Sequence, residues 1–236
     1  MARVSQEHLD ARRRQILDGA ARCFARTGFH ATSMQDVLAE VGLSAGAVYR
    51  YFRGKEELIA AIATEAFTAI RGAFEEASRA TPPPTPDVLL GAVLRLFLEE
   101  RIKGADRQAF ARLIIQVWTE TLRNEQLAET LADGYDGMRA AWTALVNAYR
   151  ESGLLHADVP ADHVARTLIA TAQGFIAQQA LFGDVAVEVL EDGLRGLMSM
   201  SVPSDAIPAA PSGVDATPTP TAPSAAGASR GVDPVG

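Results

Sequence analysis

Apolar residues recur every three or four positions along most of this chain, which is the spacing of a helix that buries one face. The first stripe predicts a helix from Val4 to about Thr27, and Gly28 ends it as a carboxyl-terminal cap. Its apolar members are Leu9, Ile16, Leu17, Ala20, Cys23 and Phe24. A half-buried strand would alternate apolar and polar residues, and no stretch does so convincingly. The pattern predicts an all-α protein.

Two short helices with a tight turn between them are predicted next. Thr32 is a suitable amino-terminal cap for the first, and Gln35 stands at the capping-box position three residues later. Gly42 ends this helix, and Ser44 is suited to cap the second. The second helix carries Val48, Tyr49 and Phe52. Two short helices joined by a glycine turn are typical of a helix-turn-helix, which we expect at residues 33–52.

The rest of the chain continues in helices as far as about residue 200. A long amphipathic helix is predicted to begin at Lys55 and to stop before Pro82. The proline-rich residues 81–86 cannot be helical throughout, so they form a loop. Five more apolar stripes follow, which brings the expected total to about nine helices; they lie at about 89–97, 110–118, 127–149, 160–182 and 185–200.

The composition is that of a globular protein, except at the carboxyl terminus. Of the 236 residues, 48% are hydrophobic, which is ample for a packed core. A single cysteine, Cys23, excludes an intramolecular disulfide, and no signal-peptide core is visible. The longest charge-free apolar segment, 167–183, is shorter than a bilayer span, so we expect a cytoplasmic protein. Residues 203–236 hold seven of the twelve prolines and little to bury, which predicts a disordered tail.

Charge changes this picture only slightly. A net charge of −7 is unusual for a nucleic-acid-binding protein, because phosphate binding commonly leaves a basic footprint. Residues 1–60, however, hold nine Lys or Arg against seven Asp or Glu, a net charge of +2 that leaves −9 for the rest. The charge of the amino-terminal helices therefore permits DNA binding without demanding it.

The residues around the predicted helix-turn-helix form a dense, almost ungapped pattern. They are Arg14-Gln15-Ile16-Leu17, Ala20-Ala21, Phe24, Gly28-Phe29, Thr32-Ser33-Met34, Val37, Val41-Gly42-Leu43-Ser44, Gly46, Val48-Tyr49, Tyr51-Phe52 and Lys55-Glu56-Glu57-Leu58. Over roughly residues 10–70 this pattern resembles the TetR family of repressors. Gly19 and Leu38 stand where that family more often has alanine, and Tyr51 replaces a frequent histidine. The resemblance implies a DNA-binding transcriptional regulator that is not an enzyme and needs no cofactor or metal.

The resemblance also assigns DNA-contacting positions. The positions where family members touch base edges are occupied here by Gln35, Ala45, Ala47 and Arg50. Arg50 is the strongest candidate, because an arginine can grip guanine through two hydrogen bonds. The positions that contact phosphates are occupied by Thr32, Tyr49, Tyr51 and Lys55. These four would place the domain on the duplex without reading its sequence.

By the same resemblance, the chain divides into an arm at 1–9, the DNA-binding domain at 10–70, a helical regulatory and dimerisation domain at 71–202, and the tail at 203–236. The last two large helices would form a homodimer, and a cavity in the regulatory domain would bind a small-molecule effector. Residues expected to line that cavity are Phe97, Gln116, Trp118, Tyr135, Met138, Trp142 and Phe175. A twofold dimer would read a palindromic operator on double-stranded DNA.

Other interpretations remain open at this point. The aromatic residues assigned to the cavity have the same spacing as an ordinary helical core. A dimer that binds DNA without any effector fits the motif equally well. A helical enzyme or ligand-binding protein that retains the helix-turn-helix is a further alternative, although no pair of nucleophile and base is visible. His156, Asp158, Asp162 and His163 cluster in the sequence as metal ligands might, but are simpler as solvated residues before and within a helix.

Overall fold

Nine α-helices, with one π-helical turn, make up the computed structural model over residues 6–100, 106–155, 158–183 and 185–200, which are the residues the structure describes. No strand occurs in these ranges. In chain order the elements are α1 (Gln6–Thr27), α2 (Met34–Val41), α3 (Ala45–Tyr49), α4 (Lys55–Arg79), α5 (Pro86–Arg95), η1 (Leu96–Glu100), α6 (Arg107–Glu120), α7 (Glu125–Glu151), α8 (Ala161–Phe182) and α9 (Val187–Met198). The predicted all-α class and all nine predicted helices are confirmed. The predicted disordered tail, 203–236, lies outside the described residues.

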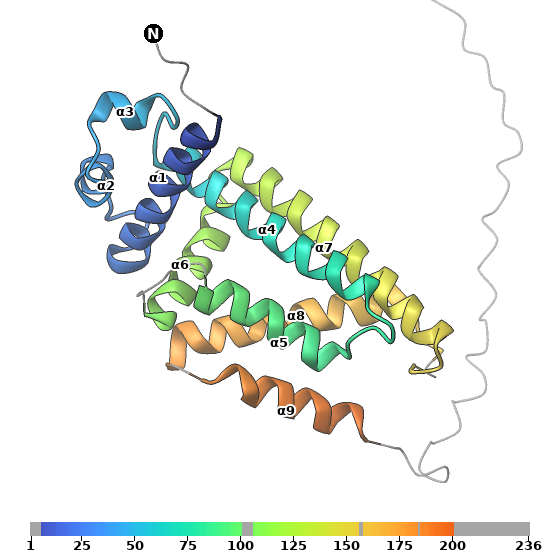
Figure 1. Cartoon of the computed structure of the whole chain (residues 1–236). Helices are drawn as coiled ribbons and strands as arrows, with labels where there is room; N and C mark the ends of the chain where they lie inside the picture. Colours follow the sequence, from blue (N-terminus) through green and yellow to red (C-terminus); the bar gives the residue numbers. More distant parts are fainter. Residues whose placement is uncertain (1–5, 101–105, 156–157, 184, 201–236) are drawn as a thin grey trace, which may run out of the picture. The chain divides into compact units, whose positions relative to one another are not determined.

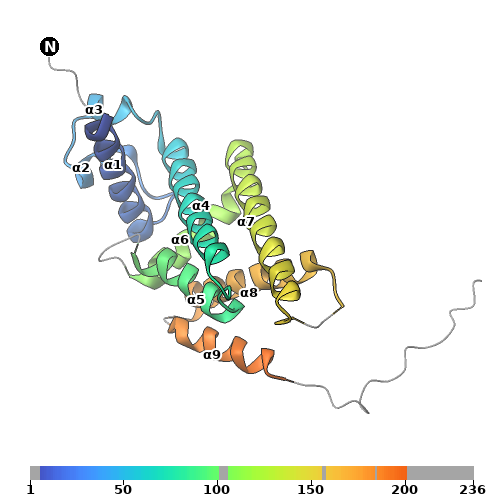
Figure 2. The ribbon, with the colours of Figure 1, turned by 45° about the vertical axis from the view of Figure 1, so that its right-hand side comes forward.

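Helices α1 to α3 and the start of α4 pack their buried side chains together, at one end of a core that continues into the rest of the protein, and we call α1 to α3 the head. Fully buried side chains from each of these helices meet there, and they include Ile16, Phe24, Val37, Val48 and Leu58. The head lies at one end of the remaining helices in both views of the ribbon (Figures 1 and 2). Since Leu58 belongs to α4, that helix runs directly from the head into the rest of the protein.

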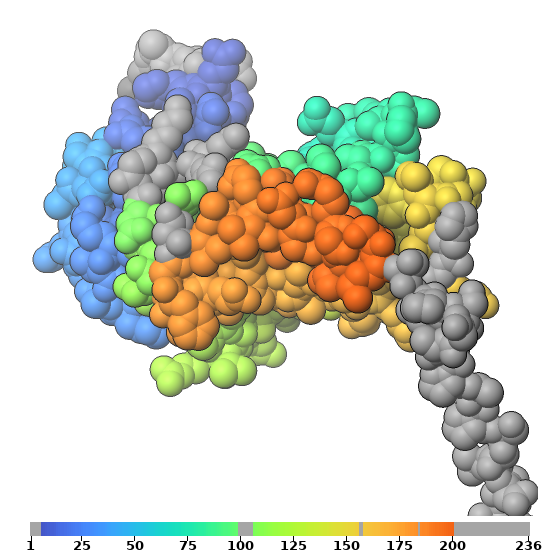
Figure 3. Space-filling model, turned by 90° about the horizontal axis from the view of Figure 1, so that it is seen from below, coloured from blue at the N-terminus to red at the C-terminus, as the bar shows by residue number. Residues whose placement is uncertain are grey.

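Helices α4 to α9 form the body. Helix α4 packs along α7, and α8 packs against both α7 and α6 (Figure 1). Helix α9 lies against α5, where Arg95 forms ion pairs with Glu188 at 3.0 Å and Glu191 at 2.6 Å. Figure 3 shows α9 on the outside of the molecule. None of the described helices is both long and apolar enough to span a bilayer.

Head and body touch directly as well as through α4. Helix α6 packs against α1, and residues up to Ser199 form one compact unit. The predicted boundary at residue 70, between a DNA-binding domain and a regulatory domain, therefore stays a prediction.

Candidate nucleic-acid interface and ligand cavity

The second helix of the head begins one residue later than the sequence suggested. The predicted cap, Thr32 with Gln35, was wrong: Ser33 caps α2, and its hydroxyl accepts a hydrogen bond from the Asp36 amide at 3.2 Å. Asp36 completes the capping box by accepting from the Ser33 amide at 2.8 Å and from its hydroxyl at 2.6 Å. These hydrogen bonds lower the pKa of Asp36 below its ordinary value.

The turn and the third helix follow the prediction closely. Gly42 has a φ of +66°, in the left-handed region that favours glycine, and its amide donates to the Leu38 carbonyl at 3.1 Å. Ser44 caps α3, and its hydroxyl accepts from the Ala47 amide at 3.4 Å. Val48 is completely buried and Phe52 nearly so, which anchors α3 against the head. The opposite face of α3 is therefore left open.

Three of the residues predicted to read bases, Ala45, Ala47 and Arg50, lie in α3 or at its end, and Gln35 lies in the first turn of α2. Ala45, Arg50 and Gln35 are exposed, and Ala47 is half-buried. Within the described residues, the side chain of Arg50 makes no hydrogen bond or ion pair. An arginine held at the end of a short helix with its guanidinium unengaged is available for the two hydrogen bonds that guanine offers.

The four predicted phosphate contacts separate into two pairs. Tyr49 is 48% exposed and Tyr51 is half-buried, on the outer part of the head. Thr32 is buried, and its hydroxyl donates to the Gly28 carbonyl at 2.7 Å. Lys55 is half-buried, and its ammonium lies 3.2, 3.3 and 3.4 Å from the carbonyl oxygens of Phe29, His30 and Thr32. Thr32 and Lys55 thus stabilise the turn between α1 and α2.

This turn is also where the body holds the head, which the sequence did not reveal. The Phe29 amide donates to Gln116 Oε1 of α6 at 2.8 Å, and His30 Nε2 lies 3.1 Å from Glu120 Oε2. Gly28 has a φ of +87°, and a β-carbon there would come within 3.2 Å of Gln116. Gln116 was predicted to line the ligand cavity, and the structure places it at the junction between body and head instead.

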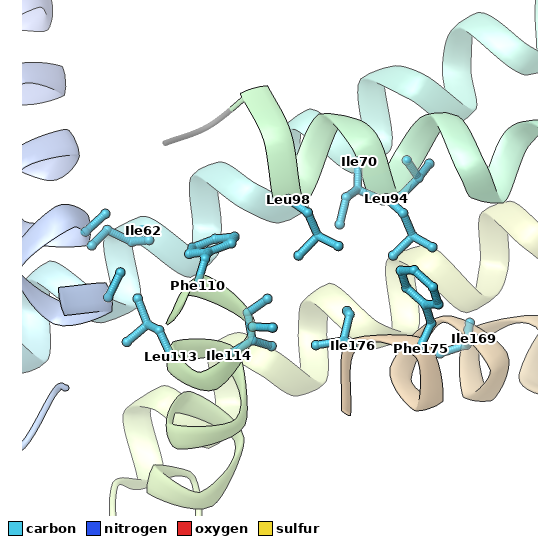
Figure 4. Packing of buried hydrophobic residues seen from close by; sticks show 14 of the residues in the cluster. Ile62, Ile70, Leu94, Leu98, Phe110, Leu113, Ile114, Ile169, Phe175 and Ile176 are labelled. Atoms are coloured by element: carbon cyan, nitrogen blue, oxygen red, sulfur yellow. The ribbon is translucent and has the colours of Figure 1, made fainter. Parts of the chain in front are cut away.

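A cavity of about 390 Å³, partly open to solvent, lies in the body and is bounded by α4, α5, η1, α6, α7 and α8. Figure 4 shows apolar side chains such as Ile70, Leu94, Ile114 and Ile176 pointing toward this interior from four helices. Its lining residues include Phe67, Phe97, Trp118, Tyr135, Ala172 and Gln173. The cavity therefore has an aromatic and aliphatic wall with few polar groups, as small-molecule sites commonly do.

The structure brings four of the seven predicted cavity residues together: Phe97, Trp118, Tyr135 and Met138. Trp142 is part of the core, with its ring edge-on to Phe74 at a centroid distance of 4.9 Å. Phe175 is buried and does not belong to the cavity wall. Gln173 does belong to it, and sequence reasoning missed this residue. The signal was present, because Gln173 falls four residues after Ile169 and three before Ile176 on one helical stripe.

The acidic and histidine residues near the start of α8 do not form a metal site in the part of the chain that the structure describes. Asp162 forms ion pairs with Arg139 at 2.7 Å and Arg166 at 2.8 Å, and both interactions lower its pKa. Among the described residues, no three potential ligands come together. His156 lies outside the described ranges.

Comparison with known proteins places both parts of the chain in the same group. Residues 16–62 match the family described as "Bacterial regulatory proteins, tetR family". Residues 91–199 match the family described as "BetI-type transcriptional repressor, C-terminal". The chain is 26% identical over 200 residues to the transcriptional repressor Rv1474c of Mycobacterium tuberculosis, which covers 83% of this chain and 99% of the relative. It is 29% identical over 188 residues to the transcriptional regulator YfiR of Bacillus subtilis, covering 77% and 86%.

Solved structures show the same fold. GusR of Salmonella enterica superposes with a TM-score of 0.63 at 28% identity, over 84% of this chain and 100% of the other. A transcriptional regulator of Saccharomonospora viridis in complex with choline superposes with a TM-score of 0.64 at 22% identity, over 80% and 96%. Both matches extend over head and body together.

Proposed function

This chain belongs to the TetR family of bacterial regulatory proteins, and on that premise we propose that it represses transcription from a palindromic operator until a small-molecule effector releases it. The protein is a DNA-binding transcriptional regulator and not an enzyme. Repression is favoured by the description of the family matched at residues 91–199. We expect it in the cytoplasm, where a bacterial chromosome is accessible.

The observation that carries the proposal is the open face of α3. Val48 and Phe52 hold this helix in the head, while Arg50 is exposed and unengaged within the described residues. We assign base reading to Arg50, with Gln35, Ala45 and Ala47 beside it. Phosphate contact by side chains is assigned to Tyr49 and Tyr51. Thr32 and Lys55 contribute by stabilising the turn, since their polar atoms are bound inside the head.

A homodimer through α8 and α9 is the second part of the proposal. Several large apolar side chains remain exposed on these two helices, with exposed fractions of 47 to 81%: Leu181, Phe182, Val189, Leu197 and Met198. Two helices from each subunit would cover these side chains in a four-helix bundle. Such a dimer would place two heads on one face of the duplex, about 34 Å apart or a multiple of that spacing.

Effector release is the third part, and two elements connect the cavity to the head. Helix α4 contributes Phe67 and Ile70 to the cavity and begins at Lys55, which holds the turn of the head. Helix α6 contributes Ile114 and Trp118 on one face and holds the same turn through Gln116 on another. A ligand that favours a different placement of either helix would change the spacing of the heads. Operator binding that responds to no ligand would favour an effector-independent regulator instead.

Operator selection tests the DNA-binding part directly. Genomic fragments bound by the purified full chain at a stated salt concentration are sequenced, because affinity for DNA depends strongly on salt. We expect an enriched palindrome whose half-sites are separated by about one helical turn. If no sequence is enriched above the input, the operator proposal is overturned.

Arg50→Ala is the first variant to test on the selected operator. We expect it to cost about 1–3 kcal/mol of binding free energy and to relax the preference at one base pair in each half-site. Arg79→Ala, at the end of α4 and away from the head, is the matched control and should bind as the wild type does. Equal losses on every operator sequence would contradict the assignment of base reading to Arg50.

A further inference from the structure

The wall of the 390 Å³ cavity carries no charged side chain among its described residues. A ligand with a formal charge would lose part of its hydration on entry and find no opposite charge in the wall to replace it, which is unfavourable against apolar side chains. The cavity therefore discriminates against carboxylates, phosphates and quaternary ammonium ions, and it favours an uncharged molecule.

Four aromatic rings from four different elements face this space. Phe67 comes from α4, Phe97 from η1, Trp118 from α6 and Tyr135 from α7. Aromatic rings at the wall of a cavity pack well against flat, apolar ligands, either face to face with an offset or edge to face. The volume is within the range of sites that bind drug-sized molecules.

Two of the four polar groups in the wall are already engaged. The Thr121 hydroxyl donates to the Trp118 carbonyl at 2.6 Å, and the Tyr135 hydroxyl accepts from Arg166 at 3.5 Å. Within the described part of the chain, the Gln173 amide and the Trp118 indole N–H have no hydrogen-bond partner. An amide both donates and accepts, so Gln173 can bind a ligand carbonyl or hydroxyl.

We propose that the effector is an uncharged, flat and largely apolar molecule that carries a carbonyl or hydroxyl group, and that Gln173 binds this group while the four rings enclose the apolar body. The inference rests on the proposed function, because it names the chemical class of the effector. Gln173 sets specificity for the polar group, and the rings set it for shape.

The experiment uses the full chain without DNA and the uncharged fluorescent ketone prodan as the probe. We expect saturable binding with emission shifted to the blue, as in an apolar site. Ala172→Phe fills the cavity and should abolish this signal. Competition then separates charge from shape: 2-acetylnaphthalene should displace prodan, whereas its anionic counterpart 2-naphthoate and the cation choline should not. Displacement by naphthoate or choline at lower concentrations than by acetylnaphthalene would overturn the proposal.

Gln173→Leu tests the polar contact. It should weaken acetylnaphthalene about three- to tenfold, the effect of losing one hydrogen bond. It should leave 2-ethylnaphthalene, which has no carbonyl, as tight or tighter. Gln126→Leu on the exposed start of α7 is the matched control. Equal weakening of both ligands, or of neither, would overturn the role of Gln173, and this test stands even if Ala172→Phe does not fold.

The same preparations are tested for operator binding in a separate gel-shift assay. If the protein binds operator but not prodan, the proposed ligand class is overturned and the proposed function as a regulator stands. If the protein binds prodan but no operator, the proposed function as a regulator is overturned, while the ligand class of the cavity stands.

Discussion

At the scale of single residues, a glycine sets how closely the first two helices of the head approach. A β-carbon added at Gly19 of α1 would lie 2.3 Å from Cγ1 of Val41 in α2, and a short branched side chain cannot swing away. We expect Gly19→Ala to destabilise the protein by about 1–3 kcal/mol despite the better helix propensity of alanine. Urea unfolding followed by circular dichroism measures this change.

Gly72 provides the control for that substitution. It lies in the interior of α4, and an added β-carbon would meet nothing within 4 Å. Gly72→Ala should therefore stabilise the protein by up to about 1 kcal/mol through helix propensity alone. If both variants shift the unfolding midpoint in the same direction, the contact between a β-carbon at position 19 and Val41 does not destabilise the protein, and the prediction is wrong.

At the scale of elements, α1 and α2 are joined by a carboxylate between two arginines. Glu40 of α2 accepts from Arg22 at 2.8 Å and from Arg26 at 3.1 Å. Hydrogen bonds from Arg22 and Arg26 lower the pKa of Glu40 below its ordinary value. A carboxyl with a lowered pKa in the folded state stabilises it fully above its unfolded pKa of about 4.3, and this contribution is lost as the pH falls through the folded value.

Glu40→Gln makes that contribution measurable. At pH 7 the variant should be less stable than the wild type by about 1 kcal/mol, because partly exposed ion pairs are screened by solvent. The difference should shrink as the pH falls below the unfolded pKa of about 4.3 and vanish below the lowered pKa of Glu40 in the folded state, because protonation removes the same charge from the wild type. Unfolding midpoints across this range test it, and a difference that grows toward acid would contradict the assignment.

At the scale of the whole molecule, Gln116 is one of the contacts between the cavity-bearing body and the head. Gln116 accepts from the Phe29 amide, and two residues further along α6 Trp118 faces the cavity. Ala172→Phe, which imitates an occupied cavity, should lower operator affinity in the wild-type chain. In a Gln116→Met background the further loss should be smaller, with a coupling energy of about 1–2 kcal/mol.

Two variants complete this double-mutant cycle. Gln116→Glu keeps an oxygen that can accept from the Phe29 amide and should retain most of the coupling. Gln126→Met, on the exposed start of α7, should leave the cycle unchanged. Strictly additive effects of Ala172→Phe and Gln116→Met on operator affinity would show that the signal does not pass through this contact.

The sequence by itself determined the helices and the turn between α2 and α3. Helical periodicity, the turn at Gly42 and the cap at Ser44 are local properties, since each depends on residues within a few positions along the chain. The burial of Val48 followed from the same spacing, whereas base reading by Arg50 was assigned from the family resemblance and stays a prediction. Among these local features the cap of α2 was misplaced, because Thr32 with Gln35 and Ser33 with Asp36 are two overlapping candidates, and Ser33 is the one that caps the helix while Thr32 is buried.

Only the tertiary structure decided which polar side chains face which space. Gln116 and Gln173 both stand near apolar stripes, yet one holds the head and the other lines the cavity. Lys55 stabilises a turn 26 residues before it in the chain, through its ammonium and the Phe29 carbonyl. Such assignments depend on how helices rotate and cross when they pack. A periodic pattern identifies the buried stripe of each helix but leaves open which partner covers its edges.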